Sequence, residues 1–143
     1  MLDEIEARLR EQLGAGPAPV LRDIGGAAAY ASVDTMPPLH LLPAAYIVPL
    51  TETAMPRQAD ALPQAVQVTF GIIIAVSAER ADPTGGQAVI RIEPVRAALR
   101  AALMGWTAPG AQTACQYAGG DLIRVGADGL WWQDSFSMEV TYG

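Results

Sequence analysis

The stretch VQVTFGIIIAVS, residues 66–77, decides the fold class. Every even position from 66 to 76 is apolar, whereas the odd positions are small or polar apart from Ile73. Successive side chains of a β-strand point to opposite faces of the sheet, so a period of two indicates a strand with one buried face. Such alternation over twelve residues is typical of an antiparallel sheet with a core on one side.

A second strand is predicted immediately before this one in the chain. Residues 44–50 are apolar and read as a buried strand, with Pro43 and Pro49 marking its ends. The polar stretch 51–63 carries two prolines and is expected to be a long loop between the two strands. Further upstream, residues 20–24 could form a short strand that Gly25 and Gly26 end, and the Pro37-Pro38 pair bars regular structure beyond it.

Two helices are predicted. In residues 2–13 apolar residues recur at spacings of three and four, with acidic residues in the first turn, where the helix dipole favours them. A second helix follows the turn at 82–86 and ends near Met104. Pro94 leaves two alternatives open: either the helix begins just before it, or the helix kinks there.

The last third of the sequence predicts a hairpin. Its arms are residues 114–125, where Gly119-Gly120 suggests a bulge, and residues 130–142, with Asp128-Gly129 as the two-residue turn. Within the final arm, Trp132 belongs to the apolar face. Its neighbour Trp131 then points to the other face or the sheet edge, where either another part of the chain covers it or it anchors a partner subunit.

These elements predict an α+β fold: an antiparallel, mostly four-stranded sheet with two helices packed on one face. No repeat or linker interrupts the 143 residues, so we expect one domain over residues 1–143.

Composition narrows the classes of protein. The net charge is −6 and nine basic residues are scattered along the chain, which argues against binding the outside of nucleic acid but would suit a channel wall along which DNA slides. The N-terminus lacks the basic and apolar regions of a signal peptide, and the longest apolar run is too short to cross a bilayer. We therefore expect no membrane partner and synthesis in the cytoplasm.

No pattern of residues predicts catalysis or a cofactor. His40 is the only histidine and Cys115 the only cysteine, so a zinc site is not predicted, and an inert pair is favoured over a Cys–His catalytic pair. The glycine pairs match no nucleotide-binding pattern, and the sequence contains no lysine. The carboxylates, Asp134 included, are interpreted as solvated loop charge by default. The prediction is that the protein is not an enzyme and has no catalytic, cofactor or metal site.

The whole order of elements resembles the tail terminator proteins of long-tailed phages. The most specific part is the C-terminal run 127–132, ADGLWW, followed by an alternating strand that ends in MEVTY, residues 138–142. Residues 43–50, PAAYIVPL, are similar to the first core strand of that family. The similarity covers nearly the full length, except that the Gly-, Ala- and Pro-rich residues 14–43 match nothing in the family pattern.

The resemblance implies a structural virion protein of the tail or neck. It implies a ring, typically of six copies, that caps the tail tube, stops its polymerisation and joins it to head-completion or connector proteins, while DNA passes through the hole. The loop 51–63 is then the candidate for reaching the neighbouring ring. Candidate interface residues are Glu52, Arg57 and Asp60 in that loop, together with Trp131.

Three alternatives remain at this level. Another neck ring protein, either a head–tail connector or a tail-completion subunit, would have a similar sequence pattern. A small bacterial enzyme or ligand-binding domain would need convergent polar residues in a concavity, which the sequence does not reveal. A dimeric regulatory module would show twofold assembly.

Overall fold

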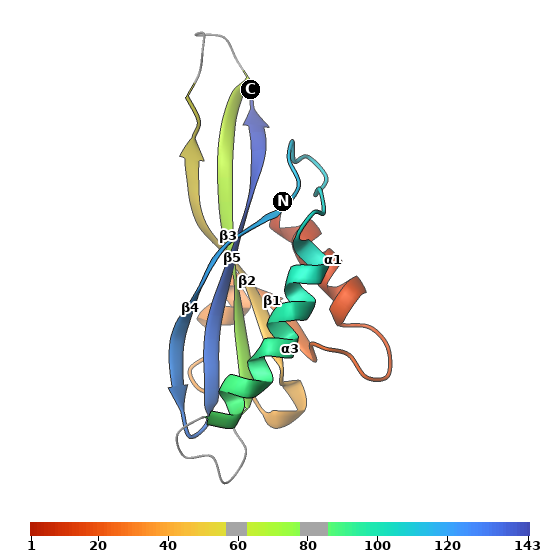
Figure 1. Cartoon of the computed structure of the whole chain (residues 1–143), viewed down its shortest axis with the longest axis vertical. Coiled ribbons are helices and arrows are strands. Elements are labelled where there is room, and N and C mark those ends of the chain that lie inside the picture. Colours follow the sequence, from red (N-terminus) through yellow and green to blue (C-terminus); the bar gives the residue numbers. More distant parts are fainter. Residues whose placement is uncertain (57–62, 78–85) are drawn as a thin grey trace.

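A computed structural model describes residues 1–56, 63–77 and 86–143 of the chain, with the backbone alone for residues 86–90. The chain forms an elongated sheet flanked by helices (Figure 1). In chain order its elements are α1 (Leu2–Leu13), β1 (Asp23–Gly26), α2 (Ala27–Ala31), the short 3-10 helix η1 (Leu39–Leu41), β2 (Ala44–Ala54), β3 (Gln64–Ser77), α3 (Gly86–Leu103), β4 (Gln116–Gly126) and β5 (Gly129–Tyr142). The strand order in the sheet is β1-β2-β3-β5-β4.

The alternating residues 66–77 form an antiparallel strand, as predicted, and this strand lies at the centre of the sheet. β3 pairs antiparallel with β2, and with β5 over its whole length from Gln64↔Tyr142 to Ser77↔Gly129. Its even-numbered side chains from Phe70 to Val76 join a core with residues of both long helices. Burying each large apolar side chain contributes about 1.5–3 kcal/mol, so this strand organises the core.

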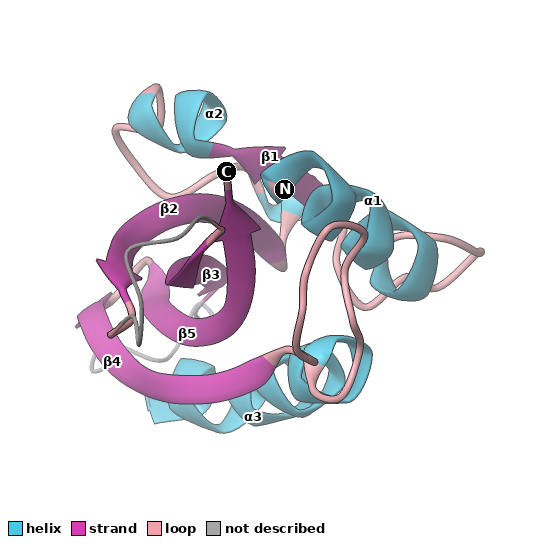
Figure 2. Ribbon diagram, turned by 90° about the horizontal axis from the view of Figure 1, so that it is seen from above, coloured by secondary structure: helices cyan, strands magenta, loops and turns pink. Residues whose placement is uncertain are grey.

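The two long helices cover the same face of the sheet, which confirms the predicted packing. Ile5 and Leu9 of α1 and Leu99 and Leu103 of α3 are fully buried in one cluster. The two helices also touch directly, because the Arg8 Nε atom of α1 donates a hydrogen bond of 3.0 Å to the Ala102 carbonyl of α3. Figure 2 shows both α1 and α3 outside the curled strands.

The position of Pro94 settles one open question about the second helix. α3 begins at Gly86, so Pro94 lies inside the helix and the alternative of a start just before Pro94 is wrong. Pro94 itself is exposed, and the helix continues past it to Leu103. The predicted end near Met104 is confirmed, because α3 ends at Leu103.

The prediction of a purely antiparallel, four-stranded sheet is wrong in one respect. A fifth strand, β1, pairs parallel with β2 from Asp23↔Ala44 to Gly26↔Ile47, so the sheet is mixed. Gly25 and Gly26 therefore do not end the strand but belong to it. The reason is close packing: a Cβ atom at Gly25 would lie 2.8 Å from the Ala29 Cβ of α2. The chain needs α2 and η1 to cross back before β2 can run parallel.

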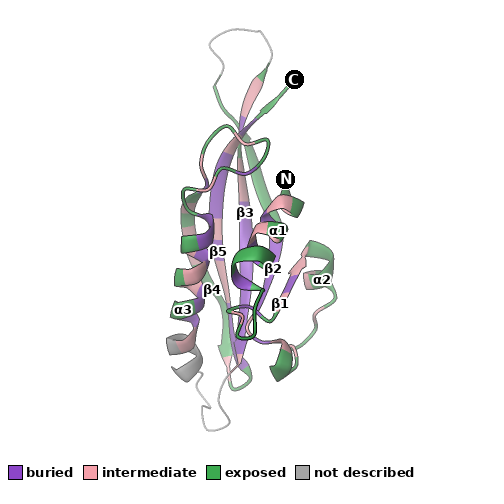
Figure 3. Ribbon diagram, turned by 90° about the vertical axis from the view of Figure 1, so that its right-hand side faces the viewer, coloured by how far each residue is buried: buried purple, intermediate pink, exposed green. Residues whose placement is uncertain are grey.

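The second face of the sheet is also covered, which the alternation in β3 did not predict. Ile73 and Ala75 of β3 pack in a second cluster with Tyr46 of β2 and Trp131 of β5. The segment from α2 to η1 covers this cluster with three partly buried residues, Tyr30, Val33 and Met36. Figure 3 shows that buried residues concentrate along the middle of the strands, while the upper ends of the same strands are more exposed.

The region predicted as a long loop is partly strand. β2 continues to Ala54 past a register shift between Pro49 and Thr51, and β3 already begins at Gln64. Residues 57–62 of the predicted loop lie outside the described residues. The extended strands form a projection beyond the helices (Figure 1), which we call the arm: residues 49–54, 64–69 and 137–142.

The C-terminal hairpin is confirmed with a shifted turn. The bulge at Gly119 is present as a register shift between Tyr117 and Gly119. Gly126 pairs with Gly129, so the two turn residues are Ala127 and Asp128 and not the predicted Asp128-Gly129. Gly129 has a φ of +144° and begins β5, and a Cβ atom there would collide with the Val76 carbonyl of β3. The close approach of the Val76 carbonyl, and not the turn, therefore explains why position 129 is glycine.

We predict that Gly129→Ala lowers the free energy of unfolding by at least about 2 kcal/mol, because the added Cβ atom meets both a strained backbone and the Val76 carbonyl. Urea unfolding followed by circular dichroism measures the change. Gly126→Ala is the matched control, since its Cβ atom would make only an ordinary contact of 3.4 Å with Asp128. Equal stability of the two variants would contradict this packing.

Candidate assembly surfaces

The arm leaves one edge of β2 open. β1 pairs only with Ala44–Ile47, so within the described part of the chain no strand pairs with β2 on that side beyond Ile47. Unpaired strand edges and exposed apolar residues are where other chains attach. Leu50, Met55 and Tyr142 of this region are exposed large hydrophobic residues. The arm is therefore one part of the fold in which apolar surface projects into solvent.

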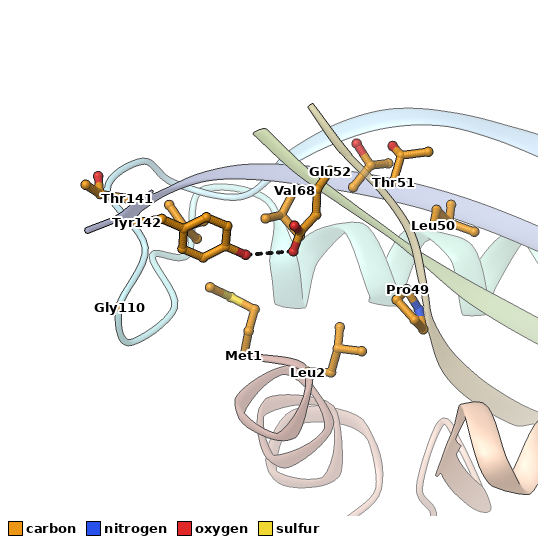
Figure 4. A pocket seen from close by; sticks show the side chains of 12 residues that line it. Met1, Leu2, Pro49, Leu50, Thr51, Glu52, Val68, Gly110, Thr141 and Tyr142 are labelled. Carbon is orange, nitrogen blue, oxygen red and sulfur yellow. Dashed lines mark hydrogen bonds between the residues drawn. The ribbon is translucent and has the colours of Figure 1, made fainter. Parts of the chain in front are cut away.

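A cleft of about 460 Å³ lies at the base of the arm, between the arm and the start of α1. Its lining is mainly apolar, with Met1, Leu2, Pro49, Leu50, Val68, Val140 and Tyr142. We call this hollow the arm-base cleft (Figure 4). Its one acidic residue is Glu52, whose carboxylate accepts a 2.7 Å hydrogen bond from the Tyr142 hydroxyl. That bond raises the pKa of Tyr142, because it holds the proton on the phenol.

Glu52, a predicted interface residue, thus lies on a strand and not in a loop. The amino group of Met1, at the N-terminal end of the cleft, forms an ion pair of 2.8 Å with Glu4. A hydrogen bond from this amino group lowers the pKa of the Glu4 carboxyl. The ion pair therefore fixes Met1, on the α1 side of the cleft, to its own helix.

A buried charged network joins α3 to the C-terminal hairpin. Asp134 of β5 is 0% exposed, and the Arg96 Nε atom of α3 lies 3.1 Å from its carboxylate. The same carboxylate accepts hydrogen bonds from the Tyr117 hydroxyl at 3.1 Å and from the Trp132 indole at 2.9 Å. The interpretation of Asp134 as solvated loop charge is therefore wrong.

The Arg96 guanidinium is held on several sides. It stacks over the Trp132 ring, 4.4 Å from the ring centroid, and donates a 2.7 Å hydrogen bond to Glu93. The negative charge of Asp134 raises the pKa of Arg96 although burial opposes this. A Cβ atom at Gly120 would lie 2.6 Å from the Tyr117 hydroxyl and 2.8 Å from Asp134 Oδ1, so the bulge glycine makes room for the network.

The two tryptophans point to opposite faces, as the strand geometry predicted. Trp132 packs against the helix-side core. Trp131 is 6% exposed and packs with Tyr30 and Tyr46, at ring centroid distances of 6.1 Å and 6.4 Å. Of the two alternatives for Trp131, cover by another part of the same chain is the one present in this structure. Its indole N–H finds no acceptor in the part of the chain that the structure describes.

The remaining residues considered for chemistry lie apart from these surfaces. Cys115 is buried in the core, and burial raises the pKa of its thiol to about 12. His40 is an exposed residue of η1. Among the described residues no three His, Cys, Asp or Glu side chains gather in a way that could hold a metal ion.

Comparison with known protein families gives one match. The family model described as phage tail terminator protein matches residues 2–143. The chain belongs to the phage tail terminator family. No curated protein matches the sequence significantly. Membership associates the protein with the virion tail and confirms the predicted resemblance. The family model also covers residues 14–43, in which no similarity was apparent from the sequence alone.

In this tail terminator, the arm contains one of the three loop residues proposed for partner contact. Glu52 lies in the arm-base cleft, whereas Arg57 and Asp60 lie outside the described residues, so their role stays a prediction. Among the helices in the described ranges, none is long and apolar enough to cross a membrane.

The structure adds a surface that sequence reasoning missed. β4 is the outer strand of the sheet, and it exposes Leu122, Ile123 and Val125 at 51%, 45% and 38%. We call residues 122–125 the β4 patch. A second register shift, between Leu122 and Arg124, falls inside it. The sequence signal for this patch is the run LIRV, in which apolar residues stand at both odd and even positions. A strand with only one buried face, as the alternation in its partner β5 implied, would have apolar residues at every second position.

For the buried network we predict that Asp134→Asn lowers the free energy of unfolding by about 2–4 kcal/mol, because the largely buried Arg96 charge loses its buried anionic partner and keeps the exposed Glu93. Asp128→Asn is the control: its pair with Arg124, at 3.5 Å, is half exposed, so it should change stability by less than about 1 kcal/mol. Urea denaturation of both variants measures the difference. A tolerant Asp134→Asn variant would contradict the role assigned to the network.

For Cys115 we predict that the native thiol resists iodoacetamide at pH 8, because it is buried and its raised pKa keeps it protonated. The folded pKa exceeds the unfolded one, so unfolding releases this proton above about pH 9, and the stability that the thiol contributes falls between there and pH 12. Mass spectrometry of alkylated native and guanidinium-unfolded protein measures the labelling. Rapid labelling of the native protein at pH 8 would contradict the burial.

Proposed function

We propose that this tail terminator assembles into a ring, of six copies by our expectation, that caps the phage tail tube. The observation that carries the proposal is the family match over residues 2–143. The ring, its partners and its position in the neck are our inference. The projecting arm supports it, because its open β2 edge and exposed apolar residues offer a surface on which another chain can pack.

The mechanism would be physical and not catalytic. In a closed ring each subunit uses one heterologous contact repeated by rotation. One face of the ring would bind the last ring of tail tube protein, and the other would not offer a tube-like surface, so polymerisation would stop there. That other face would bind head-completion or connector proteins. Residues 57–62 of the predicted loop 51–63, which follow the arm in the chain, remain the candidate for contact with the neighbouring ring.

DNA would pass through the ring without sequence-specific binding. The net charge of −6 and the small number of basic residues support this, since phosphate contacts need clustered Arg or Lys. A weakly acidic wall repels the DNA backbone and lets it slide. The same properties would suit another neck ring protein, so position on the tube is the property that distinguishes the two.

The experiment that tests this function is capping of growing tubes. Purified protein is added to tail tube protein of the same phage during polymerisation, and tube lengths are measured by negative-stain microscopy. We expect shorter tubes in proportion to added protein, with extra density at one end. The control is protein in which the arm is deleted from Thr53 to Ala65 and replaced by a short turn. Unchanged tube lengths with the intact protein would contradict the capping function.

A further inference from the structure

We propose that the contact between neighbouring copies in the ring is formed by the β4 patch of one copy inserting into the arm-base cleft of the next. This inference rests on the proposed ring function and names the two surfaces that build it. Both surfaces are apolar, both are open, and they differ from each other. A ring needs one such pair of unlike, complementary surfaces on every subunit.

The β4 patch has the properties of a surface that another chain covers. β4 is an edge strand, and within the described residues its outer side pairs with no other strand. Natural edge strands usually carry charges that prevent association, but three of the four residues of this patch are exposed, apolar and branched. The fourth, Arg124, places a cation among them.

The arm-base cleft has the complementary chemistry. It offers an apolar lining that includes Leu2, Leu50 and Val68, and its one charged side chain is the carboxylate of Glu52. One oxygen of that carboxylate accepts the Tyr142 hydroxyl, which leaves the other to accept from a guanidinium. Arg124 pairs with Asp128 only at 3.5 Å and half exposed, so exchanging this contact for Glu52 costs little.

The two surfaces cannot meet within one molecule. Residues 122–125 lie level with Leu130–Trp132 of β5, whereas the cleft uses Val140–Tyr142 of the same strand. The separation of about nine residues along a strand corresponds to roughly 30 Å. Figure 1 likewise shows β4 at the end of the sheet away from the arm. Contact between them is therefore contact between two copies.

This geometry fixes how each copy lies in the ring. In a closed ring each copy is related to the next by rotation alone, without a shift along the ring axis. The β4 patch and the cleft of one copy must therefore lie at the same height, and the line that joins them runs around the circumference. The long axis of the subunit then lies along the ring wall and not along the channel. A twofold dimer would use both surfaces reciprocally between the same two copies, whereas a ring joins each copy to two different neighbours, so the extent of cross-linking distinguishes the two.

Disulfide trapping tests the contact directly. Leu50→Cys and Leu122→Cys place one thiol in each surface, and the buried Cys115 does not interfere. Under mild oxidation we expect the double variant to give a ladder of cross-linked chains that ends at the ring number. Mixing the two single variants should give heterodimers only. Homodimers of either single variant in place of heterodimers, or no cross-links from a double variant that still assembles, would overturn the proposal.

Charge reversal gives a second readout. Arg124→Glu and Glu52→Arg alone should each raise the protein concentration for half-assembly at least tenfold by light scattering, and the double variant should restore assembly. Arg22→Glu reverses an exposed charge outside both surfaces and is the matched control. If single and control variants assemble like the wild type, this contact is wrong while the ring stands. If the wild type never forms a ring, both the contact and the ring function fail.

Discussion

The carboxylate of Asp134 is the constraint around which the C-terminal half is arranged. A charge with no solvent exposure is tolerated only when it is paired and its oxygens are hydrogen-bonded, and here Arg96, Tyr117 and Trp132 supply those partners. Each partner comes from a different position: α3, β4 and β5 itself. Satisfying one carboxylate therefore fixes the helix against the hairpin. It also demands glycine at position 120, where any side chain would enter the network.

The network has a consequence for the surface of the protein. It anchors β4 to β5 and α3 near the bulges. It therefore stabilises an edge strand whose apolar residues 122–125 are exposed and not packed in the core. The β4 patch is held at the sheet edge because Tyr117, earlier in the same strand, is hydrogen-bonded to the buried Asp134 carboxylate. At the other end of the sheet, the core thins toward the arm (Figure 3). The middle of the sheet is packed on both faces. It thus supports two open apolar surfaces near the ends of the sheet, the β4 patch and the arm-base cleft.

The sequence predicted the parts of this fold that depend on periodicity. The alternation in residues 66–77 and the spacing in residues 2–13 gave the central strand and α1, because one buried face imposes a regular pattern. The short strand suggested at residues 20–24 lies instead at Asp23–Gly26, and neither these bounds nor its parallel pairing could be predicted, since four residues with two glycines carry no period. Cover of the second face by Tyr30, Val33 and Met36 depends on where the chain crosses back, which no local pattern specifies.

The candidate surfaces were predicted less completely than the fold. The exception on the apolar face of the last strand, Asp134, was visible in the sequence, but its partner Arg96 is 38 residues away and only the folded chain brings them together. Glu52 was placed in a loop because Pro49 and Pro56 suggested a break, whereas β2 passes Pro49 with a register shift and remains paired. Loss of alternation in residues 122–125 was the one local sign of the β4 patch.

The measurement that tests the central claim most directly is the mass and shape of the purified full-length protein at high concentration. Light scattering gives the particle mass and negative-stain microscopy gives its outline on the same sample. We expect closed rings with an open centre and a mass of about six chains. A stable twofold dimer without an opening would contradict it.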